Sequence, residues 1–243
     1  TITASATVSA WFNVNTVGSY AILGRSSGSG GNYYGYIDNI GGKIRVLIRD
    51  TVNSFSLKVT NVDYNANTWY HLAITQTSGI ATIYINGTNQ GTLGARVPEL
   101  NLIGSYQNTF LFNGKLSNIA IWNTNLSAAE ITEIFNSGRP SNLNTFSGTA
   151  PVAWWQLGSN SSFNPNPTGT EGTWTCLDEI GTNNGVSDNS MTNDAITNGV
   201  GYSGNGLGTS SIEIVGSAPY STANGISNSM DVLSRSTDLP PTV

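Results

Sequence analysis

The side chains of this sequence that could carry out acid–base chemistry are few, and their spacing forms no catalytic pair. Retaining hydrolysis of a sugar bond needs two carboxyl groups about 5 Å apart. On one strand, this means acids about two to four residues apart on the same face. The fourteen acidic residues offer no such arrangement, because Glu130 and Glu133 fall in a predicted helix and Asp178 and Glu179 are adjacent. The sequence therefore predicts that the protein is not an enzyme.

The other reactive residues lack the neighbours that chemistry requires. His71 is the only histidine, and no serine or cysteine motif accompanies it, so we interpret it as a packed residue of a strand. Cys176 is the only cysteine, which excludes an intramolecular disulfide and favours a buried thiol. The glycine-rich stretch 28–31 lacks the lysine and following helix of a phosphate-binding loop. The sequence holds no zinc-type cluster.

Composition favours a surface that faces water and sugars over one that binds nucleic acid. Charged residues make up 9% of the chain and the net charge is −5, whereas an ordinary soluble domain has about 25% charged residues. The basic residues are scattered, and nucleic acid needs a concentrated basic patch. The densest group, Lys43, Arg45 and Arg49, shares one face of a strand and is interpreted as a solvated sheet face. No stretch is long and apolar enough to predict membrane insertion.

Aromatic residues in or near predicted loops are candidates for binding a glycan. An exposed ring can stack on a sugar while neighbouring asparagine side chains hydrogen-bond its hydroxyl groups. The candidates are Tyr33, Tyr34, Tyr36, Tyr106 and Phe110. Ordinary packing of these rings remains open and is the favoured alternative. Trp11, Trp69 and Trp122 are predicted to lie in the core.

Alternation of apolar residues predicts an all-β structure for the first 126 residues. In residues 7–14, Val8, Ala10 and Phe12 fall on one face and Trp11 falls on the other. The predicted strands span 7–14, 20–23, 33–50 with a hairpin turn at 39–42, 54–60, 69–77, 80–86, 90–93, 100–104 and 114–122. Many short strands at regular spacing are typical of an antiparallel jelly-roll sandwich.

One short helix is predicted after these strands. Ser127 and Glu130 form a capping box, and Gly138 and Pro140 end the helix. The apolar stripe that would pack over an edge of the sandwich consists of Ile131, Ile134 and Phe135.

The order of these motifs resembles that of laminin G-like, concanavalin A-like domains. Residues 67–75 and 81–87 are similar to the central hairpin of such domains. Residues 112–123, followed by 126–131, are similar to their last strand and short helix. The resemblance covers residues 5–139 and implies a jelly-roll β-sandwich.

The resemblance also offers Ca²⁺ as a cofactor, because related domains often hold this ion at the rim of the sandwich with carboxylates and backbone carbonyls. The candidates, which lie near strand ends, are Asp38, Asp50 and Asp63. None of them belongs to a recognisable calcium loop, so surface turn residues are the favoured alternative.

After Pro140 the sequence becomes rich in Asn, Ser and Gly, so we expect a sandwich over residues 1–140 and an extension over 141–243. Strands are predicted at 152–157 and 211–215, and few apolar runs lie between them. The family's usual first strand is missing before Thr1. We therefore hypothesise that the extension supplies an edge strand to its own sandwich or to a neighbouring subunit.

Residues 228–240 resemble the tails of laminin G-like structural proteins of marine phages and related viruses, which implies a virion. We expect a non-catalytic structural or adhesive protein on the surface of a virus particle or similar assembly. Its partners would be copies of itself or other structural subunits, reached through the extension, and glycans. The alternative is a secreted carbohydrate-binding module of a larger extracellular protein. The expected location is therefore the virion surface or the extracellular space.

Overall fold

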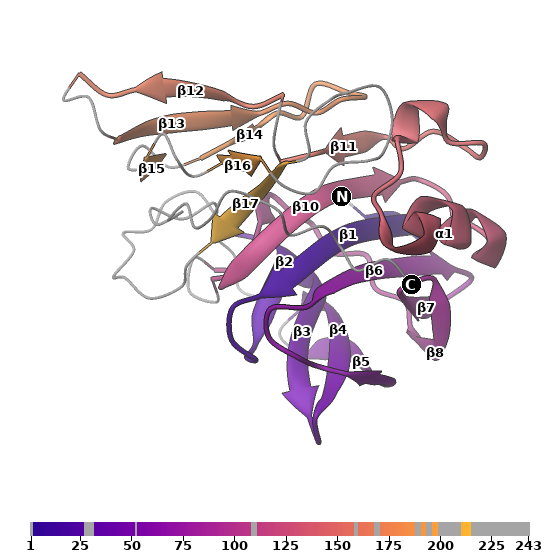
Figure 1. Ribbon diagram of the computed structural model, residues 1–243. Helices are drawn as coiled ribbons and strands as arrows, with labels where there is room; N and C mark the ends of the chain where they lie inside the picture. Colours follow the sequence, from indigo (N-terminus) through magenta and orange to yellow (C-terminus); the bar gives the residue numbers. More distant parts are fainter. Residues whose placement is uncertain are drawn as a thin grey trace.

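Two antiparallel β-sheets packed face to face form the body of the protein (Figure 1). The computed structural model describes residues 2–26, 32–51, 53–107, 111–157, 160–167, 171–187, 191–192, 196–198 and 210–214. Within both sheets the neighbouring strands run antiparallel. The predicted all-β, antiparallel jelly-roll sandwich is confirmed.

The first sheet has the strand order β16-β17-β10-β1-β6-β7-β8, and β11 also pairs with β10. Its strands are β1 (Ala6–Val14), β6 (Trp69–Thr77), β7 (Ile80–Ile85), β8 (Thr88–Gly94), β10 (Gly114–Trp122), β11 (Ala153–Trp155), β16 (Ile196–Asn198) and β17 (Ser210–Ile214). The second sheet has the order β5-β4-β3-β2-β9. Its strands are β2 (Tyr20–Gly24), β3 (Tyr33–Ile40), β4 (Lys43–Thr51), β5 (Ser54–Asp63) and β9 (Leu102–Ile103).

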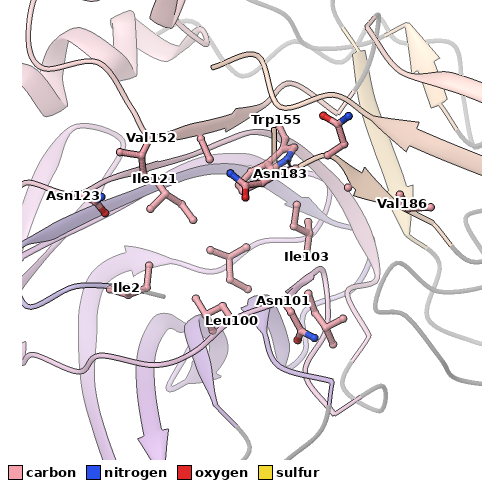
Figure 2. A pocket seen from close by; sticks show the side chains of 15 residues that line it. Ile2, Leu100, Asn101, Ile103, Ile121, Asn123, Val152, Trp155, Asn183 and Val186 are labelled. Atoms are coloured by element: carbon pink, nitrogen blue, oxygen red, sulfur yellow. Dashed lines mark hydrogen bonds between the residues drawn. The ribbon is translucent and has the colours of Figure 1, made fainter. Parts of the chain in front are cut away.

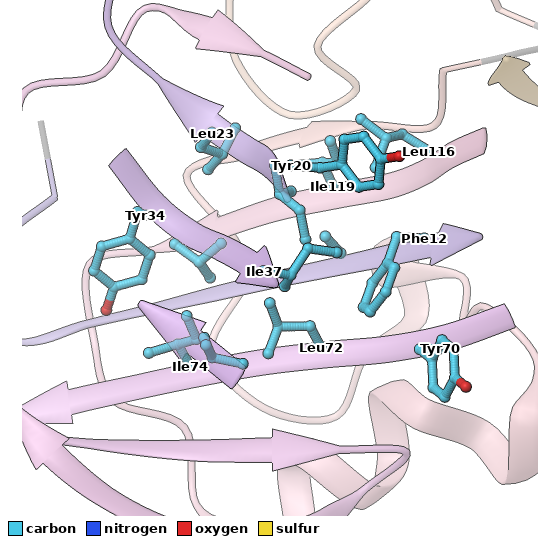
Figure 3. Packing of buried hydrophobic residues seen from close by; sticks show 14 of the residues in the cluster. Phe12, Tyr20, Leu23, Tyr34, Ile37, Tyr70, Leu72, Ile74, Leu116 and Ile119 are labelled. Atoms are coloured by element: carbon cyan, nitrogen blue, oxygen red, sulfur yellow. The ribbon is translucent and has the colours of Figure 1, made fainter. Parts of the chain in front are cut away.

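The main core fills the space between the two sheets (Figure 3). Phe12 and Leu72 of the first sheet reach toward Ile37 of the second, and all three are buried. The alternation predicted for β1 is confirmed, because Val8, Ala10 and Phe12 belong to this core. Trp11 points to the opposite face of the first sheet. Burial of such side chains supplies most of the free energy that favours folding.

The helix α1 (Ala128–Phe135) begins at the predicted capping box. The Ser127 side chain accepts a hydrogen bond from the backbone N–H of Glu130, whose carboxylate accepts one from the backbone N–H of Ser127. The α-helix ends at Phe135, because Asn136 adopts the left-handed conformation. Two 3-10 turns follow, Asn136–Gly138 and Leu143–Thr145.

The helix covers the outer face of the first sheet, which faces away from the main core. Its buried stripe packs on a cluster contributed by β6, β7, β10 and β11. The predicted burial of Trp11, Trp69 and Trp122 is confirmed. Since one face of the first sheet meets the second sheet and the other meets the helix, its central strands β1, β6 and β10 are buried nearly throughout.

Strands from the end of the chain pair with β10 in the same molecule. On the side of β10 opposite β1, β11 pairs with residues 119–121 and β17 pairs with residues 114–116. The division of the chain at residue 140, and any contact of the extension with another subunit, remain predictions.

A small third sheet lies beyond the β11 end of the first sheet (Figure 1). It consists of β12 (Ser162–Pro165), β13 (Glu171–Cys176), β14 (Gly185–Val186) and β15 (Met191–Thr192). These strands lie in the stretch with few apolar runs, where the sequence predicted none of them by position. In β13 the buried residues Gly172, Trp174 and Cys176 alternate with more exposed ones. Because glycine has no apolar side chain, this alternation was not evident from the sequence. The missing side chain of Gly172 allows the backbone oxygen of Asn164 to come close.

The carboxylate of Asp178 fastens the turn after β13 to β11. It accepts hydrogen bonds from the backbone N–H of Trp154 at 2.9 Å and of Ile180 at 3.2 Å. Burial alone would raise the pKa of Asp178, but these backbone hydrogen bonds and one from the Asn183 side chain hold it below its usual range. The two strands are therefore joined by a charged hydrogen-bond acceptor as well as by apolar packing.

Within the described residues, no helix has the length and apolar character needed to cross a membrane.

Candidate functional site

Three of the predicted aromatic candidates come together on the outer face of the second sheet. Tyr33 and Tyr36 belong to β3, and Tyr106 follows β9. The ring centroid of Tyr33 lies 5.0 Å from that of Tyr36 and 5.2 Å from that of Tyr106. Tyr36 and Tyr106 are 5.9 Å apart and meet edge to face. We call these three residues the tyrosine cluster; their tilted contacts are the arrangement that aromatic pairs prefer.

A bulge in β3 explains why Tyr33 and Tyr36 share one face although they are three residues apart. The register with β4 shifts between Tyr34 and Tyr36, and Gly35 has a φ of +77°. Side chains alternate between faces in a regular strand, so the extra residue turns Tyr36 back to the face of Tyr33. The backbone at residue 35 favours glycine because its φ lies in the left-handed region.

Backbone contacts to β2 hold Tyr106 against the cluster. The backbone N–H of Gly104 donates to the oxygen of Ile22 at 2.7 Å, and that of Gln107 donates to the oxygen of Arg25 at 2.8 Å. Between these anchors the chain passes directly over Gly24, where a Cβ atom would lie 2.4 Å from the Cβ of Tyr106. The missing side chain of Gly24 therefore creates the place that Tyr106 occupies.

The same face continues from the tyrosine cluster across β4 to the edge strand β5. In one row across the strands, Tyr33 lies opposite Arg49, which lies opposite Phe55. In the next row, Leu47 lies opposite Leu57. A pocket of about 320 Å³ opens between these rows. We call it the arginine pocket, and its lining residues are Tyr33, Arg45, Leu47, Arg49, Phe55 and Leu57.

The arginine pocket combines fixed guanidinium groups with exposed apolar side chains. The Nε of Arg45 donates to Asp38 at 2.8 Å, and the Nε of Arg49 donates to the backbone oxygen of Thr51 at 2.9 Å. The guanidinium carbon of Arg49 lies 5.9 Å from the centroid of the Tyr33 ring, a cation–π contact. Phe55 is 50% exposed and Leu57 is 42% exposed. The pocket thus offers both apolar surface and hydrogen-bond donors to a ligand.

Burial raises the pKa of all three tyrosines of the cluster, and Arg49 partly offsets this rise for Tyr33. Their hydroxyl groups therefore stay protonated in neutral solution. Tyr33 and Tyr106 are largely covered by their neighbours, whereas Tyr36 is partly exposed. Tyr36 and Phe55 are therefore the more accessible aromatic rings on this face.

Not every predicted site residue belongs to this face. Including Tyr34 among the glycan candidates was wrong, because it is fully buried in the main core and its hydroxyl donates to Oε1 of Gln76 at 3.0 Å. Phe110 lies outside the described residues. Arg45 and Arg49 share a face, as predicted, but this face is an aromatic-lined pocket and not merely a solvated one. Phe55 and Leu57 were not predicted as site residues, although their spacing places both on one face of β5.

The three calcium candidates do not form a common site. Asp38 pairs with Arg45, and Asp63 pairs with Lys43 at 2.6 Å. Asp50 lies 3.9 Å from Arg96. Across the described residues, no three His, Cys, Asp or Glu side chains gather as metal ligands. The prediction of a calcium site at these aspartates was wrong, because each carboxylate faces a basic side chain.

The acidic residues first considered for catalysis have structural contacts. The Glu133 carboxylate accepts a hydrogen bond from the backbone N–H of Ser147 at 2.8 Å, and Glu130 caps the helix. Glu179 accepts one from the Gln156 side chain at 2.9 Å. Asp178 binds backbone N–H groups, as described above. These hydrogen bonds account for the positions of all four carboxylates, and their partners are structural groups of the protein.

His71 forms a hydrogen bond with Ser9 at 2.8 Å, but the pair is sealed inside the protein. The imidazole packs between Trp11 at 5.0 Å and Phe135 at 5.8 Å. Burial lowers the pKa of His71 to about 3, so the ring stays neutral. The interpretation of His71 as a packed residue is confirmed. Cys176 is likewise buried, which raises its pKa to about 11 and leaves it unreactive.

A second pocket, of about 550 Å³, opens where β9 and β11 approach each other at the rim of the sandwich (Figure 2). Its walls are apolar side chains and asparagine amides, and the Trp155 indole N–H is already donated to the backbone oxygen of Asn183 at 2.7 Å. Its lining residues are Ile2, Leu23, Leu100, Asn101, Leu102, Ile103, Ile121, Asn123, Val152, Ala153, Trp155, Asn183, Asn184, Gly185 and Val186. No charged residue lines it. The arginine pocket therefore offers a ligand more hydrogen-bond donors in fixed directions, although it is smaller.

Comparisons with solved structures find sandwich domains of low sequence identity. The native heptameric SAP-like pentraxin from Limulus polyphemus is 16% identical with a TM-score of 0.46, over 55% of this chain and 70% of that chain. Domain 4 of AbnA, an extracellular arabinanase from Geobacillus stearothermophilus solved with arabinotriose, is 16% identical with a TM-score of 0.44, over 56% and 68%. The CBM40 of the Ruminococcus gnavus IT-sialidase, bound to α2,3-sialyllactose, is 11% identical with a TM-score of 0.44, over 56% and 84%.

Comparison with curated proteins gives no match. The family model described as the concanavalin A-like lectin/glucanases superfamily matches residues 1–132. This match spans more than half of the 243 residues and contains the second sheet, five strands of the first sheet (β1, β6, β7, β8 and β10) and most of the helix. The chain therefore belongs to the concanavalin A-like lectin/glucanases superfamily.

Proposed function

We propose that the chain is a non-catalytic saccharide-binding module and that its ligand lies on the outer face of the second sheet. One observation carries the proposal: residues from the three strands β3, β4 and β5 place aromatic rings and guanidinium groups side by side in one open pocket. Apolar ring faces bind the C–H surface of a sugar, and a few well-placed donors bind its hydroxyl groups. The arginine pocket and the tyrosine cluster supply both.

Replacing Phe55 by alanine tests this proposal with little risk to the fold, because the side chain is half exposed on an edge strand. We expect the affinity for the bound saccharide to fall about threefold to tenfold, the loss that corresponds to one aromatic contact of about 0.5–1.5 kcal/mol. A glycan array would identify the ligand, and isothermal titration calorimetry would measure both affinities.

Ile80→Ala is the matched control, because Ile80 is an exposed apolar residue of similar accessibility on β7 of the first sheet. Its affinity for the saccharide should equal that of the unchanged protein. A blank array, or equal losses in the two variants, would contradict the assignment of a saccharide site to this face.

A second proposal keeps the expectation of a structural or adhesive protein on a virus particle or similar assembly. The supporting observation is the row of exposed apolar residues Phe55, Leu57 and Val59 on β5, since such a row on an edge strand is typical of a contact with another protein. Contacts with neighbouring subunits through the extension belong to the same proposal.

Sedimentation of the full chain, together with immunogold electron microscopy of its native source, tests this second function. Assembly in solution and regular labelling of a particle surface are expected. A monomer at micromolar concentration that labels no particle would instead favour a secreted carbohydrate-binding module of a larger extracellular protein.

A further inference from the structure

We propose that the saccharide bound by this face carries a carboxylate or sulfate group, and that Arg49 in the arginine pocket binds that group. This inference rests on the proposed saccharide-binding function and specifies the chemical class of its ligand.

Two of the six residues that line the arginine pocket are arginines, and the others are aromatic or aliphatic. Asp38 holds Arg45 in an ion pair that offsets its charge, so the attraction of an anion depends on Arg49. A pocket that binds only hydroxyl groups is usually lined by amide and hydroxyl side chains. Such side chains are abundant in this chain. A guanidinium group instead presents a planar fork of N–H donors that matches the oxygens of a carboxylate or sulfate.

The two arginines converge on the pocket from one strand. They are four residues apart on β4, which places their Cα atoms about 13 Å from each other, with Leu47 between them on the same face. A guanidinium group attracts an opposite charge that is placed near it. A charged ligand therefore gains an attraction here that a neutral ligand of the same shape does not.

Contacts within the protein hold both guanidinium groups in position before a ligand arrives. Asp38 orients Arg45, and the Thr51 backbone oxygen together with the Tyr33 ring orients Arg49. Fixing a long side chain in advance reduces the conformational entropy lost on binding. The nearby carboxylate of Asp50 lies next to Arg96, 3.9 Å away.

The positive charge of Arg49 is opposite in sign to the net charge of the chain. The net charge is −5, so an anionic ligand is repelled by most of the molecule. The arginine pocket offers local attraction, and such a local field guides a charged ligand to one place on the surface.

The test compares ligands that differ only in charge. The full chain is applied to an array of neutral, carboxylated and sulfated glycans, and then titrated with trigalacturonic acid, its neutral methyl ester and a sulfated galactose oligosaccharide. We expect the best anionic ligand to bind at least about tenfold more tightly than its neutral counterpart, as for a hydrogen bond to a charged group. Raising the salt concentration from 0.05 to 0.5 M, which shortens the screening length, should reduce this preference.

Arg49→Gln should abolish the preference for the charged ligand, because it lowers the affinity for the anionic ligand much more than the affinity for its neutral counterpart. Lys58→Gln is the control, because it removes one positive charge from the same sheet on the opposite face of β5, where the Lys58 side chain approaches Gly91. Lys58→Gln should keep the preference. Melting temperatures of both variants should show that they fold.

Each outcome separates this inference from the function on which it rests. Equal or tighter binding of neutral glycans would overturn the inference and leave the saccharide-binding function standing. A preference for anions that survives in Arg49→Gln would also overturn it, since the anion would then bind elsewhere. Binding of no glycan of any class would overturn both.

Discussion

Replacing Gly24 by alanine is expected to displace Tyr106 and to weaken saccharide binding about tenfold while the protein remains folded. The added Cβ would lie 2.2 Å from the backbone oxygen of Ser105 and 2.4 Å from the Cβ of Tyr106. Both atoms lie close to the backbone, so side-chain rotation cannot relieve the contact and the segment after β9 must move. Tyr106 would then leave the tyrosine cluster, and small displacements of positioning groups reduce binding and catalysis strongly.

The mechanism of this loss can be verified with a double-mutant cycle. Tyr106→Ala alone should reduce the affinity as much as Gly24→Ala, and the combined variant should lose no more than either one, because both remove the same ring from the same place. Calorimetric titration measures the affinities, and thermal unfolding should show a cost of about 1–3 kcal/mol for Gly24→Ala, as for other overpacked sites.

Gly94→Ala is a suitable control glycine. It lies in β8, and an added Cβ would meet only the hydroxyl oxygen of Ser56, which can rotate away. Its binding affinity should stay unchanged. If Gly24→Ala also bound saccharide normally, Tyr106 would have no part in the site.

Replacing Trp154 by alanine is expected to cause the largest loss of stability, about 3–5 kcal/mol, because it empties a fully buried aromatic position. The indole packs against Trp122 and Ile131 under the helix, and its N–H donates to Oδ1 of Asn118 at 3.3 Å. For a chain of this size, the melting temperature should fall by about 6–20 °C.

This substitution also tests how residues beyond 140 relate to the sandwich. Trp154 belongs to β11, and Trp174 and Cys176 of β13 contribute to the main core. We therefore expect one cooperative transition that shifts as a whole. Val152→Ala, which truncates an exposed residue two positions away, should change stability by less than about 0.5 kcal/mol. An unchanged melting temperature for Trp154→Ala would show that β11 is not part of the cooperative unit.

The local pattern of residues determined most of the elements. Apolar alternation and turn residues predicted β1, β6, β7 and β10 nearly to their ends, because those strands bury one face against a core and end at glycine or asparagine turns. The capping box predicted the start of the helix, since both of its hydrogen bonds connect residues three positions apart.

Where the regular alternation of side chains along a strand is interrupted, only the tertiary structure decides which face of the sheet a residue occupies. Tyr34 was a glycan candidate because it was expected in or near a loop, but in β3 it points inward, opposite Tyr33. The bulge at Gly35 then returns Tyr36 to the face of Tyr33. In β13, Gly172 hid the alternation because its burial results from the close approach of another strand.

By itself, the sequence determined an all-β sandwich with one capped helix, because these depend on neighbours within a few positions. The tertiary structure decided that Tyr33, Tyr36 and Tyr106 meet, that Arg45 and Arg49 open into one pocket with Phe55, and that the aspartates face basic side chains. These contacts depend on which strands become neighbours in a sheet. Strand pairing joins residues far apart in the chain, such as Gly24 and Leu102, and no local pattern specifies it.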